Sequence, residues 1–116
     1  FNYNAGAMAN DALWSGLPIL TKQGESYVAR MASSLLNAID LPELITSNDN
    51  DYEQIALDLA THPNKLELLK AKLSINRDNT SLFDTARFTK NIETAYTQMH
   101  EKYLANQNPE HLFIKE

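Results

Sequence analysis

The chain has 116 residues, of which 43% are hydrophobic and 22% are charged, a composition typical of one globular domain. Its formal net charge is -5, with no clustered excess of Lys and Arg, which argues against a nucleic-acid surface. Cysteine is absent, so disulfides and thiolate metal sites are excluded. No apolar run reaches the length of a membrane span and no signal peptide is recognisable, so we expect a cytoplasmic protein without a membrane partner.

The first part of the chain predicts a helix, a strand and a second helix. Residues 7–15 have the pattern of a short helix that ends at Gly16, and the apolar residues 17–21 have that of a brief buried strand. Apolar residues then recur at helical spacing from Glu25 onward. Residues 43–46 are either a very short second strand or merely extended chain.

Two further helices are predicted in the middle of the chain, and we expect them to lie antiparallel. Asn50 and Glu53 have the spacing of a capping box at the start of the first. Thr61 is a candidate cap for the second, which has Pro63 in its first turn, where the missing amide hydrogen costs little.

A long last helix is predicted behind Asp84, its candidate cap, and runs to about Asn106. Residues 107–116 contain a proline and little periodicity. We therefore expect a domain over residues 1–106 and a tail over residues 107–116 that is ordered only when a surface receives its apolar side chains.

The strand at residues 17–21 is the one strand that the pattern predicts clearly. Both edges of a parallel-type strand need neighbours, because its backbone groups must be hydrogen-bonded. Either the domain is essentially all-helical with an extended crossing segment, or its sheet is completed by sequence outside this chain. The second alternative needs a larger parent protein, which agrees with Phe1, rather than Met, as the first residue.

The segment from residue 4 to residue 14 contains the first candidate site. Gly6 lies at a helix entrance, where glycine lets a ligand approach and the free amide hydrogens and the helix dipole favour an anion such as a diphosphate. Asp11 shares a helix face with Ala7 and Met8, where its carboxylate can accept hydrogen bonds from ribose hydroxyls. The alternative is a simple turn glycine, with an aspartate that only the helix dipole stabilises.

The loop at residues 21–26 is a second candidate, because it follows the predicted strand directly into a helix and Lys22 can supply a charge there. The alternative is a solvated surface lysine. No metal site is predicted, because the three histidines stand far apart without the spacing or carboxylate partners of metal ligands. The chain also lacks a nucleophile elbow and a phosphate-binding loop of the Walker type, so we assign no catalytic residue.

Several stretches resemble the end of a known catalytic region. The run from Asp11 to Thr21, then Gly24 with Glu25, then Arg30 to Ser34, closely resembles the last part of O-linked N-acetylglucosamine transferases and SPINDLY-like glycosyltransferases, most of all their bacterial branch. The resemblance continues, in order, through residues 41–45, 51–53, 82–85 and 108–111. It spans nearly the whole chain, which makes it more specific than any single motif.

This resemblance implies an α/β fold, namely a mostly helical carboxy-terminal fragment of a Rossmann-like GT-B domain that binds the nucleotide sugar. It also implies a parent protein with upstream tetratricopeptide repeats that present protein substrates. The implied reaction transfers a sugar, expected to be N-acetylglucosamine from UDP-GlcNAc, to Ser or Thr hydroxyls. The UDP-sugar is a donor substrate, and neither a metal nor another cofactor is implied.

In the family, the helix entrance that matches Gly6, Ala7 and Met8 contacts the donor's diphosphate, and the aspartate that matches Asp11 contacts the ribose. Relatives typically have two threonines at the positions of Ala7 and Met8, so we expect a weakened or altered donor site. The family's catalytic lysine and histidine lie upstream, which implies that the fragment alone is inactive. The alternative function is a non-catalytic helical protein-interaction domain whose donor site has decayed.

Overall fold

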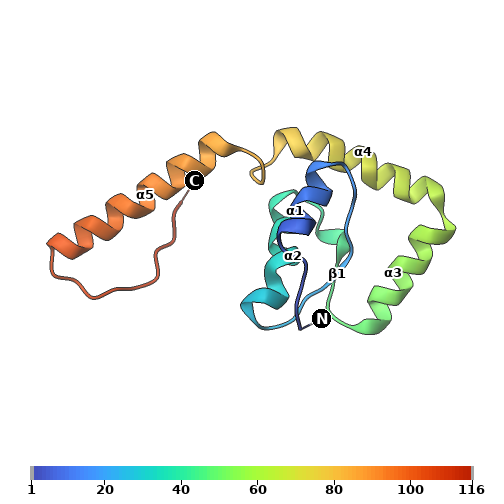
Figure 1. Cartoon of the computed structure of the whole chain (residues 1–116), viewed down its shortest axis with the longest axis horizontal. Helices are drawn as coiled ribbons and strands as arrows, with labels where there is room; N and C mark the ends of the chain where they lie inside the picture. The colour runs from blue at the N-terminus through green and yellow to red at the C-terminus, as the bar shows by residue number, and fades with distance from the viewer. Residues whose placement is uncertain (1, 116) are drawn as a thin grey trace. The chain divides into compact units, whose positions relative to one another are not determined.

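The computed structural model describes residues 2–115, so Phe1 and Glu116, the outer ends of the predicted domain and tail, lie outside the described residues. In chain order the elements are α1 (Ala7–Trp14), β1 (Thr21–Lys22), α2 (Tyr27–Ala38), the 3-10 helix η1 (Pro42–Leu44), β2 (Ile45–Thr46), α3 (Asp49–Thr61), α4 (Pro63–Asn79) and α5 (Thr85–Leu104) (Figure 1). The chain divides into two compact units, one that ends at Phe83 and one that begins at Asp84. The expected boundary between residues 106 and 107 stays a prediction.

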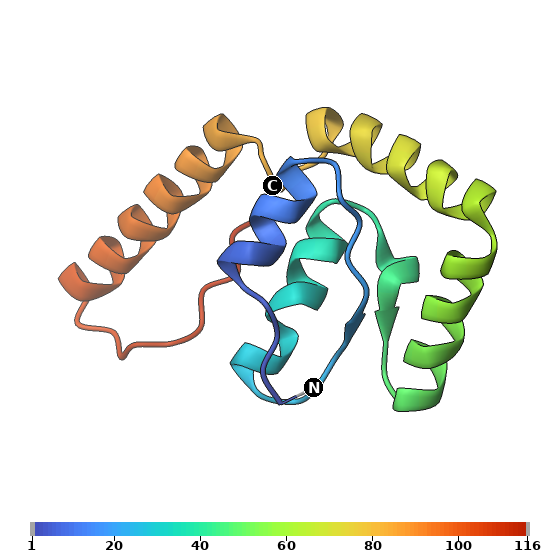
Figure 2. The ribbon, with the colours of Figure 1, turned by 45° about the vertical axis from the view of Figure 1, so that its right-hand side comes forward.

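A small parallel sheet connects the elements of the first unit. Thr21 pairs with Ile45 and Lys22 with Thr46. The Thr46 hydroxyl donates a hydrogen bond of 2.9 Å to the Thr21 carbonyl, and the Gln23 amide donates one of 2.8 Å to the Thr46 carbonyl. Figures 1 and 2 both show the two strands between the pair of helices α1 and α2 on one side and α3 on the other.

The strand predicted at residues 17–21 is wrong in its bounds, because pairing begins only at Thr21. Gly16 has a φ of 84°, and the Leu17 amide turns back to donate a hydrogen bond of 2.8 Å to the Ala12 carbonyl. These residues therefore close α1, and Leu17 is 57% exposed. The second strand, left open between two alternatives, is present at Ile45–Thr46, so the described residues contain a two-stranded sheet rather than an isolated strand.

A leucine-rich core holds the first unit together. Its fully buried members come from α1, α2, η1, α4 and the residues between α2 and η1, and they are Leu13, Leu36, Ile39, Leu41, Leu44 and Leu73. The Asn76 side chain adds hydrogen bonds of 2.9 and 3.1 Å to the carbonyls of Ile39 and Asp40. The inner face of α4 carries Leu73, which is fully buried, and Leu66 and Leu69, which are half-buried.

The caps of α3 and α4 differ from the prediction. Asn48, not Asn50, caps α3, and its side chain accepts a hydrogen bond of 2.8 Å from the Asp51 amide. The start is earlier because β2 ends at residue 46 and Asn48 is still extended. Thr61 is the last residue of α3, where its hydroxyl donates to the Leu57 carbonyl, and Pro63 opens α4 as predicted.

Helices α3 and α4 meet at a corner rather than lying antiparallel side by side, as Figures 1 and 2 show. Only His62 separates the two helices, and its backbone is bent away from the helical conformation (φ -123°, ψ 80°). A single linking residue is too short to reverse the direction of the chain. The expected antiparallel arrangement is therefore wrong.

The second unit consists of α5 and the residues that follow it. Asp84 caps α5 as predicted, and its carboxylate accepts a hydrogen bond of 2.9 Å from the Arg87 amide. The helix ends at Leu104, two residues before the predicted end, and Asn106 has a φ of 53° that stops it. Residues 107–115 contain no helix or strand.

Replacing Leu73 by alanine is expected to lower the free energy of unfolding by about 2–5 kcal/mol, because it leaves a cavity in the core. Leu68→Ala on the same helix is the matched control, since Leu68 is 71% exposed and its loss is expected to cost less than about 0.5 kcal/mol. Urea unfolding followed by circular dichroism measures both. Equal losses for the two variants would contradict the location of the core.

Candidate functional site

The entrance of α1 has unpaired amide hydrogens and no acid in its first turn. Gly6 precedes the helix without a side-chain cap, and the first turn contains no acidic residue. The Asn10 amide makes the first bond of the helix, 3.1 Å to the Gly6 carbonyl, so the amides of Ala7 and Met8 have no acceptor within residues 2–115. Both residues are exposed. An anion can therefore approach these amides at the positive end of the helix dipole.

Asp11 lies on the solvent side of the same helix. Its side chain is exposed, whereas Ala9 and Leu13 on the opposite side are buried. The structure thus brings Asp11 to the face that carries Ala7 and Met8, as the helical spacing predicts. The arrangement offers amide donors for an anion and, one turn further on, a carboxylate that can accept hydrogen bonds from hydroxyl groups.

Gly6 is not required by a positive φ or by packing. Its φ is -103°, and an added Cβ would meet the Met31 side chain at 3.7 Å, an ordinary contact. Gly16 is the opposite case, with a φ of 84° and open space around it. The presence of glycine at position 6 therefore fits a position where a ligand approaches the backbone closely.

Asn4 anchors the segment that leads to this entrance, a role that the sequence does not reveal. Its amide donates 2.9 Å to the Val28 carbonyl, and its side chain donates 3.5 Å to the Lys22 carbonyl. The residue is only 7% exposed, and its Oδ1 has no partner among the described residues. A buried amide oxygen without a donor is costly, and a hydroxyl group of a ligand would satisfy it.

At the second predicted site, around Lys22, the charge of the lysine is paired with a carboxylate of α3. The Lys22 ammonium lies 2.6 Å from the Asp49 carboxylate, in the first turn of α3, and the lysine side chain is only 23% exposed. The hydrogen bond from Lys22 holds the pKa of the Asp49 carboxyl below its usual range. Lys22 is therefore ion-paired with an acid of α3, and a ligand-binding role for the loop at residues 21–26 stays a prediction.

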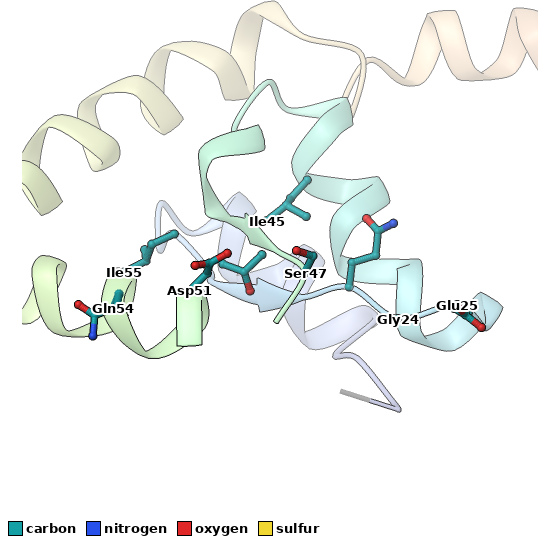
Figure 3. A pocket seen from close by; sticks show the side chains of 9 residues that line it. Gly24, Glu25, Ile45, Ser47, Asp51, Gln54 and Ile55 are labelled. Atoms are coloured by element: carbon teal, nitrogen blue, oxygen red, sulfur yellow. The ribbon is translucent and has the colours of Figure 1, made fainter. Parts of the chain in front are cut away.

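A cleft of about 590 Å³ opens at the carboxyl ends of the two strands. Figure 3 shows Ile45 and Ser47 between Gly24 and Glu25 on one side and α3 on the other, from which Asp51 contributes its carboxylate. Glu25 and Asp51 make this strand-end cleft acidic, and no Lys, Arg or His lines it. A diphosphate is therefore better accommodated at the α1 entrance than here.

Residues 2–115 contain no group of three or more His, Asp or Glu side chains with the geometry of a metal site. His62 contacts one carboxylate, that of Asp58, at 3.1 Å, and Lys65 shares this carboxylate. Within the same described residues, no helix has the length and apolar character to cross a bilayer.

Comparison with known proteins decides the family. Residues 3–92, most of the chain, match the model of glycosyl transferase family 41. The chain belongs to this family. The resemblance carried by residues 11–34 and by the later stretches up to residue 85 is thereby confirmed.

Relatives of the family 41 chain are named as peptide N-acetylglucosaminyltransferases. An Arabidopsis thaliana protein, SEC, named as a probable UDP-N-acetylglucosamine–peptide N-acetylglucosaminyltransferase, is 34% identical over 114 residues. The Caenorhabditis elegans UDP-N-acetylglucosamine–peptide N-acetylglucosaminyltransferase is 31% identical over 109 residues. These alignments cover 97% and 94% of this chain but only 12% and 10% of the two relatives.

A solved structure has the same fold over most of the chain. A mutant of the Thermobaculum terrenum O-GlcNAc transferase superposes with a TM-score of 0.77 at 33% identity, over 84% of this chain and 19% of that one. The predicted fold class, a mostly helical α/β fragment of such a catalytic region, is confirmed. The roles of Gly6, Ala7, Met8 and Asp11 are not tested by these comparisons and stay predictions.

Gly16→Ala is expected to lower the free energy of unfolding by about 1 kcal/mol, because alanine is strained at a φ of 84°. Gly6→Ala is the matched control and is expected to leave stability nearly unchanged, since its φ is negative and the Met31 contact accommodates a Cβ. Thermal unfolding compares the two variants. A larger loss for Gly6→Ala would show that the entrance glycine serves packing instead.

Lys22→Met is expected to raise the pKa of Asp49 towards its ordinary value of 3.8, because the hydrogen bond and charge of the lysine are lost. The folded-state pKa of Asp49 lies below its unfolded-state value, so the ion pair stabilises the fold above about pH 4 and this stabilisation is lost as pH falls through the folded-state pKa. NMR titration of the carboxyl chemical shifts against pH measures the pKa of Asp49.

Lys65→Met serves as the control for this titration. It is expected to raise the pKa of Asp58, whose carboxylate accepts a hydrogen bond from Lys65, and to leave Asp49 unchanged. If Asp49 titrates identically in the wild type and in Lys22→Met, the ion pair between β1 and α3 is absent in solution.

Proposed function

We propose that this chain is the donor-nucleotide part of a protein O-glycosyltransferase that transfers N-acetylglucosamine from UDP-GlcNAc to Ser or Thr hydroxyls. The match to glycosyl transferase family 41 over residues 3–92, together with the names of the relatives, supports this activity. The single observation that carries the role of this chain is the open, acid-free entrance of α1, with Asp11 exposed on the same helix.

The donor diphosphate binds at the entrance of α1, where the backbone amides of Ala7 and Met8 donate to it and Gly6 permits a close approach. Asp11 accepts hydrogen bonds from the ribose hydroxyls. Ala7 and Met8 offer no side-chain hydroxyls, and each missing hydrogen bond to a charged group lowers affinity by about tenfold or more. The site therefore binds the nucleotide through backbone amides and is weaker than one with two threonines.

The rest of the machinery lies outside this chain. The proposed parent has the GT-B architecture, acts in the cytoplasm without a metal, and presents its protein substrates on tetratricopeptide repeats. The lysine and histidine that steady the leaving diphosphate and orient the acceptor precede this segment in the family. Transfer depends on such positioned charges around the leaving nucleotide, so this chain alone is inactive.

A second function is favoured by the entrance itself. Ala7 and Met8 provide no hydroxyl donors, and Met8 is 80% exposed. These residues fit a non-catalytic helical interaction domain whose donor site has decayed. The sequence upstream separates the two functions: with the family's catalytic lysine and histidine in place the enzyme is favoured, and without them the interaction domain is.

Titration of uridine diphosphate into the full-length protein is expected to raise its melting temperature, because the ligand binds only the folded state. Asp11→Asn is expected to lower the affinity for the nucleotide about tenfold, since the charged acceptor for the ribose hydroxyls is lost. Calorimetric titration of the wild type and the variant measures this. Guanosine diphosphate is titrated in parallel, because backbone amides and a carboxylate at the α1 entrance do not select the base of the nucleotide.

Asp40→Asn is the matched control, because Asp40 is exposed just after the far end of α2 and asparagine tolerates its φ of 56°. This variant is expected to bind the nucleotide like the wild type. No thermal shift with either nucleotide at millimolar concentration would overturn the donor-site proposal, and an unchanged affinity in Asp11→Asn would remove Asp11 from the site.

A further inference from the structure

A second cleft, of about 480 Å³, runs along α2 and meets the strand-end cleft at Gln23, which lines both. It is lined by Gln23 and by residues of α2, among them Arg30, Ser33, Ser34 and Asn37. No Asp or Glu lines it, although the chain has 15 acidic residues and a net charge of -5. Its chemical character is therefore the reverse of that of the strand-end cleft.

Arg30 is the unpaired cation of this α2 cleft. Every other Lys and Arg among the described residues of the first unit has a carboxylate partner, and these pairs are Lys22–Asp49, Lys65–Asp58, Lys70–Glu67, Lys72–Glu43 and Arg77–Asp78. The Arg30 side chain is exposed and has no ion pair within residues 2–115. Its planar guanidinium carries five donors arranged to bind an oxyanion with two parallel hydrogen bonds.

Ser33 supplies the second observation. It is only 2% exposed, and its hydroxyl has no hydrogen-bond partner among the described residues. A buried hydroxyl without a partner is costly, which favours an acceptor provided from outside the chain. Ser34 and Asn37 are exposed on the neighbouring turn, four residues after Arg30 and Ser33 respectively, so their donors face the same cleft.

We propose that the α2 cleft binds the phosphate group of a small phosphate ester. A guanidinium, hydroxyls and side-chain amides approach from several directions, which suits the oxygens of a phosphate better than the two of a carboxylate. The exposed Tyr27 ring and Met31 line the same cleft and offer an apolar wall for the organic part of the ester. None of these residues belongs to the proposed diphosphate site at the α1 entrance.

The two sites are nevertheless neighbours. Met31 lines the α2 cleft, and its Cγ lies within contact distance of the space beside Gly6. The phosphate therefore has two possible sources, a separate phosphorylated molecule or the nucleotide donor itself. The chemistry recognised by Arg30 and Ser33 is the same in both cases, and competition between the two ligands separates them.

The test is calorimetric titration of the full-length protein with inorganic phosphate and, separately, with uridine diphosphate. Arg30→Gln is expected to weaken phosphate binding about tenfold or more. Arg30→Lys is expected to weaken it less, because lysine keeps the charge but not the paired donors. Ser33→Ala is expected to weaken phosphate while leaving the melting temperature unchanged or higher, since it removes an unpaired buried hydroxyl. Lys90→Gln, an exposed cation of α5, is the matched control and is expected to bind like the wild type.

Saturating uridine diphosphate distinguishes the sources. If phosphate still binds and Arg30→Gln leaves uridine diphosphate binding unchanged, the cleft serves a separate phosphate ester. If phosphate is displaced and Arg30→Gln also weakens the nucleotide, the cleft holds a phosphate of the donor. Arg30-dependent phosphate binding without any nucleotide binding would uphold this site and overturn the proposed donor function.

Any of three results would overturn the proposal: a wild type that does not bind phosphate, an Arg30→Gln variant that binds phosphate as tightly as the wild type does, or acetate that binds to the cleft as tightly as phosphate. Circular dichroism of each variant confirms that it is folded, which is expected because Arg30 is exposed.

Discussion

The parallel pairing of β1 with β2 is the interaction on which the first unit depends. Parallel neighbours cannot be joined by a tight turn, so the chain between Lys22 and Ile45 must leave the sheet and return through α2 and η1. That excursion buries Leu36, Ile39, Leu41 and Leu44 in one core with Leu13 of α1 and Leu73 of α4. The parallel pairing thus requires the crossover through α2 and η1, and the core that these helices form stabilises the two residue pairs of the sheet.

The same pairing separates charges around the sheet. Both carboxyl ends open on one side, where Glu25 and Asp51 make the strand-end cleft acidic and Asp49 takes up the charge of Lys22. The entrance of α1 and the α2 cleft contain no carboxylate in their first turn or lining. The α1 entrance and the α2 cleft therefore repel an anion less than the strand ends do, although a parallel sheet alone would suggest the strand ends.

Local pattern was sufficient for the helices but not for their exact caps or for the residues that make the sites. Periodicity located α2, α4 and α5, and glycine chemistry located the end of α1 at Gly16. Asn48, rather than the predicted Asn50, caps α3 because β2 ends at residue 46. The end of β2 cannot be predicted from the spacing of nearby residues. The strand was predicted at residues 17–21 but lies at residues 21–22, because the Leu17 amide donates a hydrogen bond back to α1. Asn4 and Ser33 are ordinary in sequence, and only tertiary packing leaves their polar atoms buried without partners.

A crystal structure of the full-length protein with uridine diphosphate tests most directly whether the entrance of α1 binds the diphosphate of a nucleotide donor. We predict diphosphate oxygens within hydrogen-bond distance of the amides of Ala7 and Met8, with the ribose hydroxyls beside the carboxylate of Asp11. A nucleotide bound with its diphosphate elsewhere, and these amides facing only solvent, would show that the entrance of α1 is not the diphosphate site.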